Sequence, residues 1–199
     1  MRVAMLAPFA LHPKGTTRWR MLPLAAALAA AGHQVGVFIP PYDWPQHSGR
    51  RWLHRGVEVC AVTLPQSLAL AGHSQLAWRL AQAALAWQPD VVHCFKPKGY
   101  SGLAGWLLAQ RRLPLVVDAD DWEQGWNALA GYPAAWRLFF GWQERRGLRR
   151  AGAVTAASRW LVDYARSLRA PPAVGSVFYL PNGVEPAPIS PAQRAAGDG

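Results

Sequence analysis

Residues 24–39 read LAAALAAAGHQVGVFI and place a helix, a glycine and a strand in direct succession. Alanine and leucine favour a helix in the first half, and Gly32 is the residue expected just beyond a helix C-terminus. The apolar run Gln34–Ile39, which Pro40 ends, predicts a strand buried on both faces. The apolar run Arg2–Ala7 predicts another strand before the helix, so the chain opens with a strand–helix–strand unit.

The same alternation of short apolar runs and helical segments continues along the chain. Thr16 or Thr17 is expected to cap the first helix, and the polar stretch Trp44–Arg55 is expected to be irregular. Further strands are expected at Val57–Val62, Val91–Phe95, Leu115–Asp118, Ala153–Ala156 and Val177–Leu180. Further helices are expected at Leu76–Trp87, Leu103–Arg111, Ala134–Arg150 and Ser158–Leu168. This order predicts an α/β, Rossmann-like, doubly wound and mainly parallel sheet, with helices on both faces and the first strand central.

The composition is that of a globular protein, with 51% hydrophobic and 16% charged residues among 199. The net charge of +10 favours an anionic partner such as a phosphorylated substrate or an anionic lipid. Binding to nucleic acid is not expected, because no recognition motif accompanies the charge. The chain has only two cysteines, too few for a disulfide framework, which favours a reduced, cytoplasmic protein.

Two loops that follow predicted strands carry lysines and glycines. Lys14–Arg18 leads into the first helix, and Lys96–Tyr100 follows the strand at Val91–Phe95. Ligands of open α/β sheets bind at the carboxyl ends of strands. Both loops are therefore candidates for contacting a phosphate or carboxylate, although a plain turn and a solvated basic loop are the alternatives.

An acidic turn follows the strand at Leu115–Asp118, where residues 118–123 read DADDWE. Carboxylates this close repel one another and need compensation by a metal, a basic residue or a hydroxyl-rich substrate. One hypothesis is a metal site built on Asp118, Asp120 and Asp121. Another is a sugar site in which these carboxylates accept hydroxyls and Trp122 or Trp126 stacks on the ring. A third is a helix N-cap with the other carboxylates solvated.

Five segments, in order, resemble the N-terminal domain of GT-B glycosyltransferases of the GT4-like group. They are Met1–Pro8, LAAALAAAGHQVGV at 24–37, QPDVVH at 88–93, WQERRGLRRAGAVTAAS at 142–158 and LPNGVE at 180–185. The chain differs from that family in two places. Lys14-Gly15 stands where the family has a double glycine, and Asp118–Asp121 stands where it often has His-Asp.

The resemblance implies transfer of a sugar from a nucleotide-activated donor to a glycan or lipid-linked acceptor, with retention of configuration and without a metal or other cofactor. It implies an acceptor-side domain at 1–184 and a linker at 185–199 that leads to a C-terminal, donor-binding domain. On this hypothesis the chain alone is inactive and binds sugar nucleotides weakly or not at all. The alternatives are a non-catalytic module that pairs with a separate donor subunit, and a metal-dependent enzyme.

The candidate site residues fall into three groups. The catalytic candidates are Asp118, Asp120 and Asp121. The candidates for the acceptor and for donor phosphates are Lys14, Gly15, Thr16, Arg18, Lys96, Lys98, Gly99 and Tyr100. The interdomain candidates are Asn182 and Gly183, and no metal ligand is assigned. Because strand ends meet at one edge of a sheet, the three loops are expected to cluster, with Lys96 and Lys98 compensating the aspartates.

The segment Ala134–Arg150 predicts an amphipathic helix that separates an apolar face from a basic one. Tryptophan and arginine together favour the headgroup region of an anionic membrane. The sequence therefore predicts peripheral attachment to the inner face of the plasma membrane. The residues expected to make it are Trp136, Trp142, Arg145, Arg146, Arg149 and Arg150.

Overall fold

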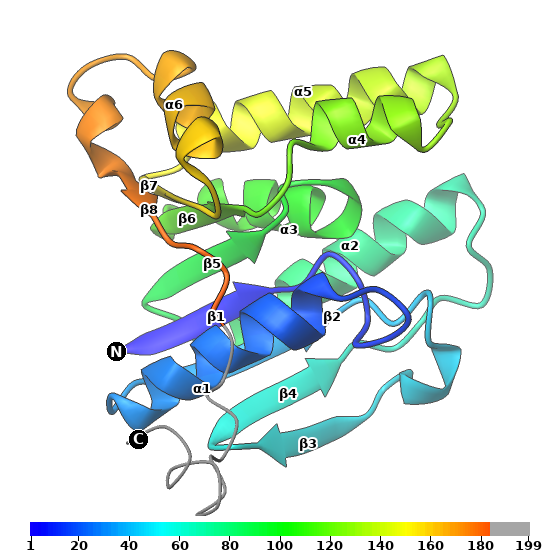
Figure 1. Ribbon diagram of the computed structural model, residues 1–199. Coiled ribbons are helices and arrows are strands. Elements are labelled where there is room, and N and C mark those ends of the chain that lie inside the picture. Colours follow the sequence, from blue (N-terminus) through cyan, green and yellow to red (C-terminus); the bar gives the residue numbers. More distant parts are fainter. Residues whose placement is uncertain (184–199) are drawn as a thin grey trace, which may run out of the picture.

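The structure is a computed structural model that describes residues 1–183, and β1 (Arg2–Leu6) lies near the middle of its sheet (Figure 1). In this part of the chain the sheet has eight strands in the order β3-β4-β2-β1-β5-β6-β7-β8. The neighbours of β1 are β2 (Gln34–Ile39) and β5 (Val91–Phe95), both parallel to it. The expected central position of the first strand is confirmed. The expected linker at 185–199 lies outside the described residues.

The remaining strands extend the sheet on both sides of β1. Beyond β2 lie β4 (Val57–Ala61) and the edge strand β3 (Arg51–His54). Beyond β5 lie β6 (Leu115–Ala119), β7 (Ala153–Ala156) and β8 (Val177–Tyr179). Every described pairing is parallel except that of β3 with β4. The prediction of a mainly parallel α/β sheet is confirmed.

Helices cover both faces of the sheet, as the doubly wound prediction requires. One face packs against α1 (Leu22–Ala30) through Val3, Met5 and the alternate residues of β2 and β4. The opposite face packs against α2 (Leu70–Ala86), α3 (Gly99–Ala109) and α5 (Ala134–Arg150). Two further helices, α4 (Glu123–Leu129) and α6 (Arg159–Ser167), contact α5 and the strands β7 and β8 respectively. Period-two alternation along each strand divides the core into these two halves.

The prediction that Trp44–Arg55 is irregular is wrong for its second half. Arg51–His54 forms β3, which pairs antiparallel with β4 through the tight turn at Arg55 and Gly56. Both turn residues have positive φ angles, 50° and 80°, which suit a two-residue hairpin turn. The strand forms the edge of the sheet, where only one side is paired, and its residues RWLH do not alternate between apolar and polar.

The expected cap of the first helix is also wrong. The helix begins with a π-helical turn, η1 (Thr16–Met21), whose N-cap residue Gly15 makes no side-chain cap. The hydroxyl of Thr17 donates to the carbonyl of Phe9 instead, and that of Thr16 donates to a distant carboxylate. By contrast, Ser158 caps α6 as expected, because its Oγ accepts from the backbone N–H of Leu161.

Candidate functional site

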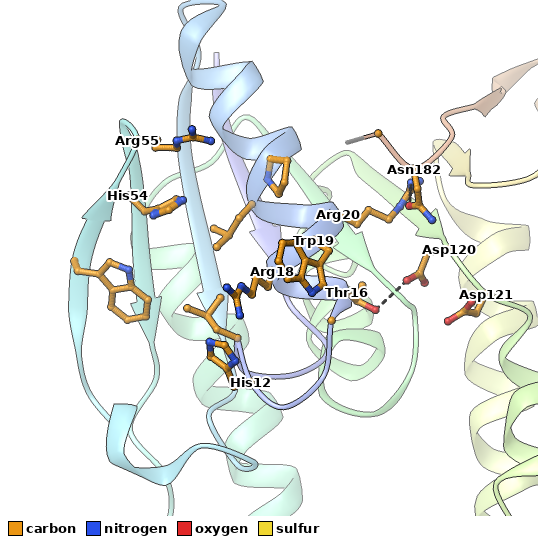
Figure 2. A pocket seen from close by; sticks show the side chains of 16 residues that line it. His12, Thr16, Arg18, Trp19, Arg20, His54, Arg55, Asp120, Asp121 and Asn182 are labelled. Carbon is orange, nitrogen blue, oxygen red and sulfur yellow. Dashed lines mark hydrogen bonds between the residues drawn. The ribbon is translucent and has the colours of Figure 1, made fainter. Parts of the chain in front are cut away.

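The three predicted loops meet at the carboxyl ends of β1, β5 and β6, as expected. The hydroxyl of Thr16 donates to Asp120 at 3.0 Å, and Lys96 lies 3.4 Å from Asp120. A pocket of about 930 Å³ opens beside this contact (Figure 2). Of the predicted site residues, those that line it are Gly15, Thr16, Arg18, Asp120, Asp121, Asn182 and Gly183.

Asp118 does not line the pocket, and its side chain is fully buried. Arg20 donates to both of its oxygens, at 2.7 and 2.8 Å, in a planar, two-point ion pair. The hydroxyl of Thr155 on β7 donates to the same carboxylate at 2.6 Å. Burial alone would lower the pKa of Arg20, but Asp118 outweighs it and raises that pKa. Asp118 therefore acts as a structural anchor within this geometry.

Arg20 is the compensating cation that the sequence reasoning missed. Besides pairing with Asp118, it donates to the side-chain oxygen of Asn182 at 2.8 Å and to the carbonyl of Leu180 at 2.9 Å. These contacts join η1 and β6 to the end of the described chain. No local pattern marks Arg20 apart from Arg18, because the partner lies 98 residues away.

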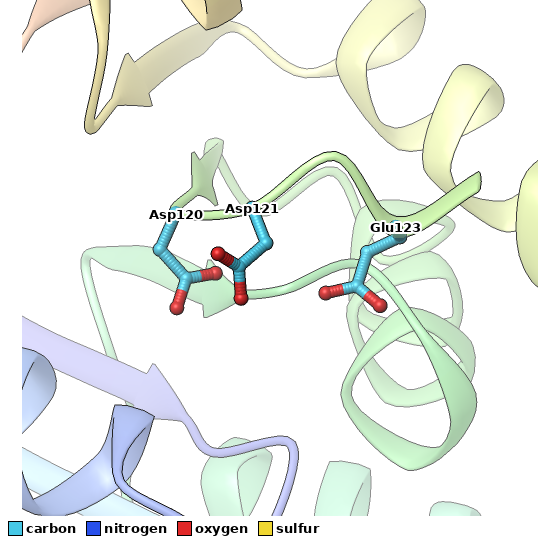
Figure 3. A group of neighbouring side chains, drawn as sticks. All are labelled: Asp120, Asp121 and Glu123. Atoms are coloured by element: carbon cyan, nitrogen blue, oxygen red, sulfur yellow. The ribbon is translucent and has the colours of Figure 1, made fainter. Parts of the chain in front are cut away.

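Lys96 compensates the acidic turn, as predicted for this residue. Its ammonium group is hydrogen-bonded to Asp121 and lies 3.4 Å from Asp120 and 3.1 Å from Glu123. Figure 3 shows these three carboxylates side by side. Burial opposes the charge, but the carboxylates around it raise the pKa of Lys96 above its ordinary value. Lys96 therefore stays protonated and fixes the direction of the turn.

The prediction that Lys98 compensates the same aspartates is wrong. Lys98 pairs with Glu123 at 2.9 Å and donates to Asn127. Glu123 is a buried member of the cluster that the sequence reasoning left unassigned. Lys96 therefore contacts the two aspartates that line the pocket, and Lys98 contacts two residues of α4, while neither lysine lines the pocket itself.

Three of the other loop candidates do not line the pocket and contact other residues instead. Lys14 contacts Tyr42 at 3.2 Å and lies over the ring of Phe9. The hydroxyl of Tyr100 lies 2.6 Å from the ring of His73, while Gly99 donates its N–H to Gln143. The pocket excludes Trp122 and Trp126 as well, and the tryptophans that line it are Trp19 and Trp52.

Burial raises the pKa of Asp120 to about 6, although Lys96 and the Thr16 hydroxyl act in the opposite direction. Asp120 is therefore a carboxyl group that can exchange a proton near neutral pH. Asp121 is half exposed beside it. Together they form the acidic end of the pocket.

The N-terminus of α4 is held by a second buried carboxylate, Glu144 on α5. Its two oxygens accept the backbone N–H groups of Glu123 and Gln124, at 3.0 and 3.1 Å. Burial raises the pKa of Glu144 to about 7 despite these hydrogen bonds. The helix N-cap that was one alternative for the aspartates is thus supplied by a residue 21 positions beyond Glu123. Glu144 lies within WQERR at 142–146, which is part of one of the segments that resemble the family, so the resemblance could have pointed to this glutamate.

The oxygens of Asp120, Asp121 and Glu123 lie within 4.8 Å of one another, a spacing that suits a hard cation. The ammonium of Lys96 already contacts all three carboxylates. A divalent ion there would have to displace this lysine from a buried position. The geometry thus favours compensation by lysine over the metal hypothesis.

Residues 15–183 match the family model described as the glycosyl transferase 4-like domain. The chain belongs to this glycosyl transferase 4-like family. The match begins at Gly15 in the first loop and ends at Gly183, so it includes the acidic turn and both sides of the pocket. No curated protein sequence matches the chain.

Solved structures share the Rossmann-like, GT-B type fold of this glycosyl transferase 4-like chain. Sucrose-phosphate synthase from Thermosynechococcus elongatus aligns with a TM-score of 0.69 and 17% identity, over 92% of this chain and 48% of that one. UGT89C1 of Arabidopsis thaliana, complexed with UDP-L-rhamnose, aligns with a TM-score of 0.57 and 15% identity, over 98% and 53%. UDP-N-acetylglucosamine 2-epimerase from Rickettsia bellii aligns with a TM-score of 0.57 and 7% identity, over 92% and 45%. This chain therefore spans about half the length of these structures.

Breaking the buried ion pair should destabilise the fold. We expect Asp118→Asn and Arg20→Met each to lower the free energy of unfolding by about 3 kcal/mol, because each leaves one buried charge unpaired. The double variant should lose less than the sum of the two. Urea denaturation measures all three, and Arg18→Met is the matched control on the same helical turn. Strictly additive losses would show that the two residues do not interact.

The stability of the chain should depend on pH through Asp120. A carboxyl group whose pKa is raised in the folded state, here from 3.8 to about 6, favours folding when protonated and loses that contribution as the pH rises through 6. We therefore expect Asp120→Asn to gain stability relative to the parent chain between about pH 4 and about pH 7. Urea unfolding of both chains across this range gives the difference between their free energies of unfolding. Glu144 is present in both chains, so its titration does not contribute to this difference. A difference that does not change with pH contradicts the assignment.

Proposed function

We propose that this domain is the acceptor-binding half of a retaining glycosyltransferase that moves a sugar from a nucleotide-activated donor to a hydroxyl of a glycan or lipid-linked acceptor. A second, donor-binding domain would complete the enzyme, and the chain alone would bind sugar nucleotides weakly. The family match gives glycosyl transfer as the reaction class. The observation that carries the acceptor role is the pair Asp120 and Asp121 at the mouth of the large pocket.

The acidic end of the pocket suits the chemistry of transfer. The bond between the anomeric carbon and the donor phosphate breaks as a bond to the acceptor oxygen forms, and positive charge develops on the sugar. Carboxylates held in place near that carbon stabilise the charge without reorganisation. Asp120, with its pKa of about 6, can accept the proton that the acceptor hydroxyl loses as its oxygen bonds to the anomeric carbon, while the donor phosphate leaves with the electron pair of the broken bond.

The fixed geometry of these carboxylates supports a positioning role. Thr16 in η1 and Lys96, which directly follows β5, hold Asp120 from two different parts of the chain, and Lys96 also holds Asp121. A side chain locked from several directions keeps its orientation when substrate binds, and orientation contributes much of the rate enhancement in such reactions. A non-catalytic module that pairs with a separate donor subunit is the alternative, and it has no need for this arrangement.

In the complete enzyme, Asp120→Asn and Asp121→Asn should each lower turnover by roughly tenfold to a hundredfold, because each removes charge stabilisation in the transition state. Urea midpoints should change little for Asp121, which is half exposed. Asp163→Asn, on the exposed side of α6, is the control and should keep full activity. Full activity in both variants would leave the acidic turn with a structural role only.

We also propose that the domain attaches peripherally to an anionic membrane through α5. Three of its large apolar side chains are exposed, namely Trp136 at 39%, Leu138 at 72% and Trp142 at 47%. Arg149 and Arg150 are exposed near its C-terminus, and Arg146 lies over the ring of Trp142. Aromatic and basic side chains side by side suit the headgroup region of an anionic bilayer. Within residues 1–183 no helix is long and apolar enough to cross a membrane.

Two of the four predicted arginines also have partners inside the domain. Arg145 donates to the side chain of Gln124 at 2.8 Å, and Arg149 donates to the carbonyl of Leu168 at 3.3 Å. Among the four, Arg146 and Arg150 are therefore the better probes of a membrane contact.

Replacing these two arginines should weaken binding to lipid. We expect Arg146→Ser with Arg150→Ser to reduce sedimentation with anionic vesicles by about tenfold or more at low salt, since each basic residue contributes ~1 kcal/mol. Arg50→Ser with Arg51→Ser, at the opposite edge of the sheet, removes the same charge and should have a much smaller effect. Equal binding to neutral and anionic vesicles, or equal loss in both double variants, would refute attachment through α5.

A further inference from the structure

The pocket beside the acidic turn has a second end with the opposite character. It extends from Asp120, Asp121 and Asn182 along η1 to the hairpin of β3 and β4 (Figure 2). At that far end its lining includes His12, Arg18 and His54. Asp120 and Asp121 are the only carboxylates among the described residues that line the pocket. One pocket thus has an acidic end and a basic end.

Arg18 differs from its neighbour Arg20 in a way that points to an external partner. Arg20 is buried, and Asp118, Asn182 and Leu180 occupy its donors. Arg18 is exposed and lies 4.4 Å from the ring centre of Trp19, and its guanidinium has no ion pair within residues 1–183. Stacking on an aromatic ring orients a guanidinium while leaving its N–H donors available.

A row of aromatic rings in edge-to-face and stacked contacts lies behind the basic end of the pocket. The ring of His12 lies 4.2 Å from that of Trp44, Trp44 lies 4.9 Å from His47, and His47 lies 5.5 Å from Trp52. Trp44 is partly buried, and its indole nitrogen has no hydrogen-bond partner. This row of rings connects the loop after β1 to β3 and holds His12 and Trp52 on the pocket wall.

We infer that the basic end binds an anionic group, a phosphate or a carboxylate, carried on the acceptor sugar. This inference rests on the proposed acceptor role and extends it by naming the chemical class of the acceptor. Arg18 offers two N–H donors in a plane that matches either anion, and the imidazole rings of His12 and His54 each carry an N–H group that can donate as well. Trp19, which is 66% exposed, and Trp52 offer flat apolar faces on which a sugar ring packs.

The size and the two ends of the pocket fit this class of ligand. A volume of about 930 Å³ is in the range of sites for small molecules. An acceptor anchored by its anion at Arg18 places its remaining hydroxyls toward Asp120 and Asp121. The reacting hydroxyl and the anionic group would then lie at opposite ends of the acceptor, and a neutral sugar would lose the anchor.

Nuclear magnetic resonance of the 199-residue chain tests the inference. The probes are glucose 6-phosphate, glucuronate and glucose, and the observed signals are the indole N–H groups of Trp19 and Trp52, assigned with the Trp19→Phe and Trp52→Phe variants. We expect a saturable shift with the phosphate or the carboxylate sugar and none with glucose. The anionic sugar that binds more tightly shows whether the site prefers a phosphate or a carboxylate group.

Arg18→Gln should weaken binding of the anionic sugar by about tenfold, the loss expected for one charge-assisted hydrogen bond. Arg166→Gln, exposed on α6, is the matched control and should bind like the parent chain. Equal shifts with glucose and the anionic sugars, no saturable shift with either anionic sugar, or unchanged binding in Arg18→Gln would each overturn the inference. These binding results are independent of the turnover of the Asp120 and Asp121 variants. The proposed function can therefore be refuted while this inference holds, and this inference can be refuted while the proposed function holds.

Discussion

The buried ion pair between Arg20 and Asp118 is the interaction on which the rest of the site depends. Two charges out of water are tolerated only when the geometry is good and the remaining donors are satisfied. Here the guanidinium contacts both carboxylate oxygens, Asn182 and Leu180, and Thr155 completes the shell of Asp118. The pair therefore fixes η1 against β6 and brings the chain at 180–182 to the same edge of the sheet.

The charges at this edge are arranged so that each end of the pocket keeps one sign. Lys96 contacts Asp120 and Lys98 pairs with Glu123, and burial nevertheless raises the pKa of Asp120 to about 6. Arg20 is withdrawn into the core, which leaves Arg18 as the arginine of η1 that faces solvent. The side chains that line the pocket therefore include carboxylate acceptors at one end and a guanidinium donor at the other.

The fold alone does not select this chemistry. Structures with the same architecture include a sucrose-phosphate synthase and a UDP-N-acetylglucosamine 2-epimerase, which their names assign to different reactions. The family match gives glycosyl transfer as the class of reaction. Any finer property depends on the side chains at the carboxyl ends of the strands. The exposed aromatic residues of α5 belong to a different surface, since none of them lines the large pocket.

The sequence by itself determined a mainly parallel α/β sheet, the central place of its first strand and the meeting of three loops at one edge, because apolar periodicity and right-handed crossovers are general rules. It also gave the compensation of Asp120 and Asp121 by Lys96, since adjacent parallel strands end together. It did not predict the edge strand Arg51–His54, because the four residues RWLH do not alternate between apolar and polar side chains. Only the tertiary structure decided that Arg20 is the partner of Asp118, that Glu144 caps α4 and that Thr16 contacts Asp120. These partners lie 98, 21 and 104 residues apart, and a choice among several similar side chains at such separations depends on packing and burial, which no local pattern contains.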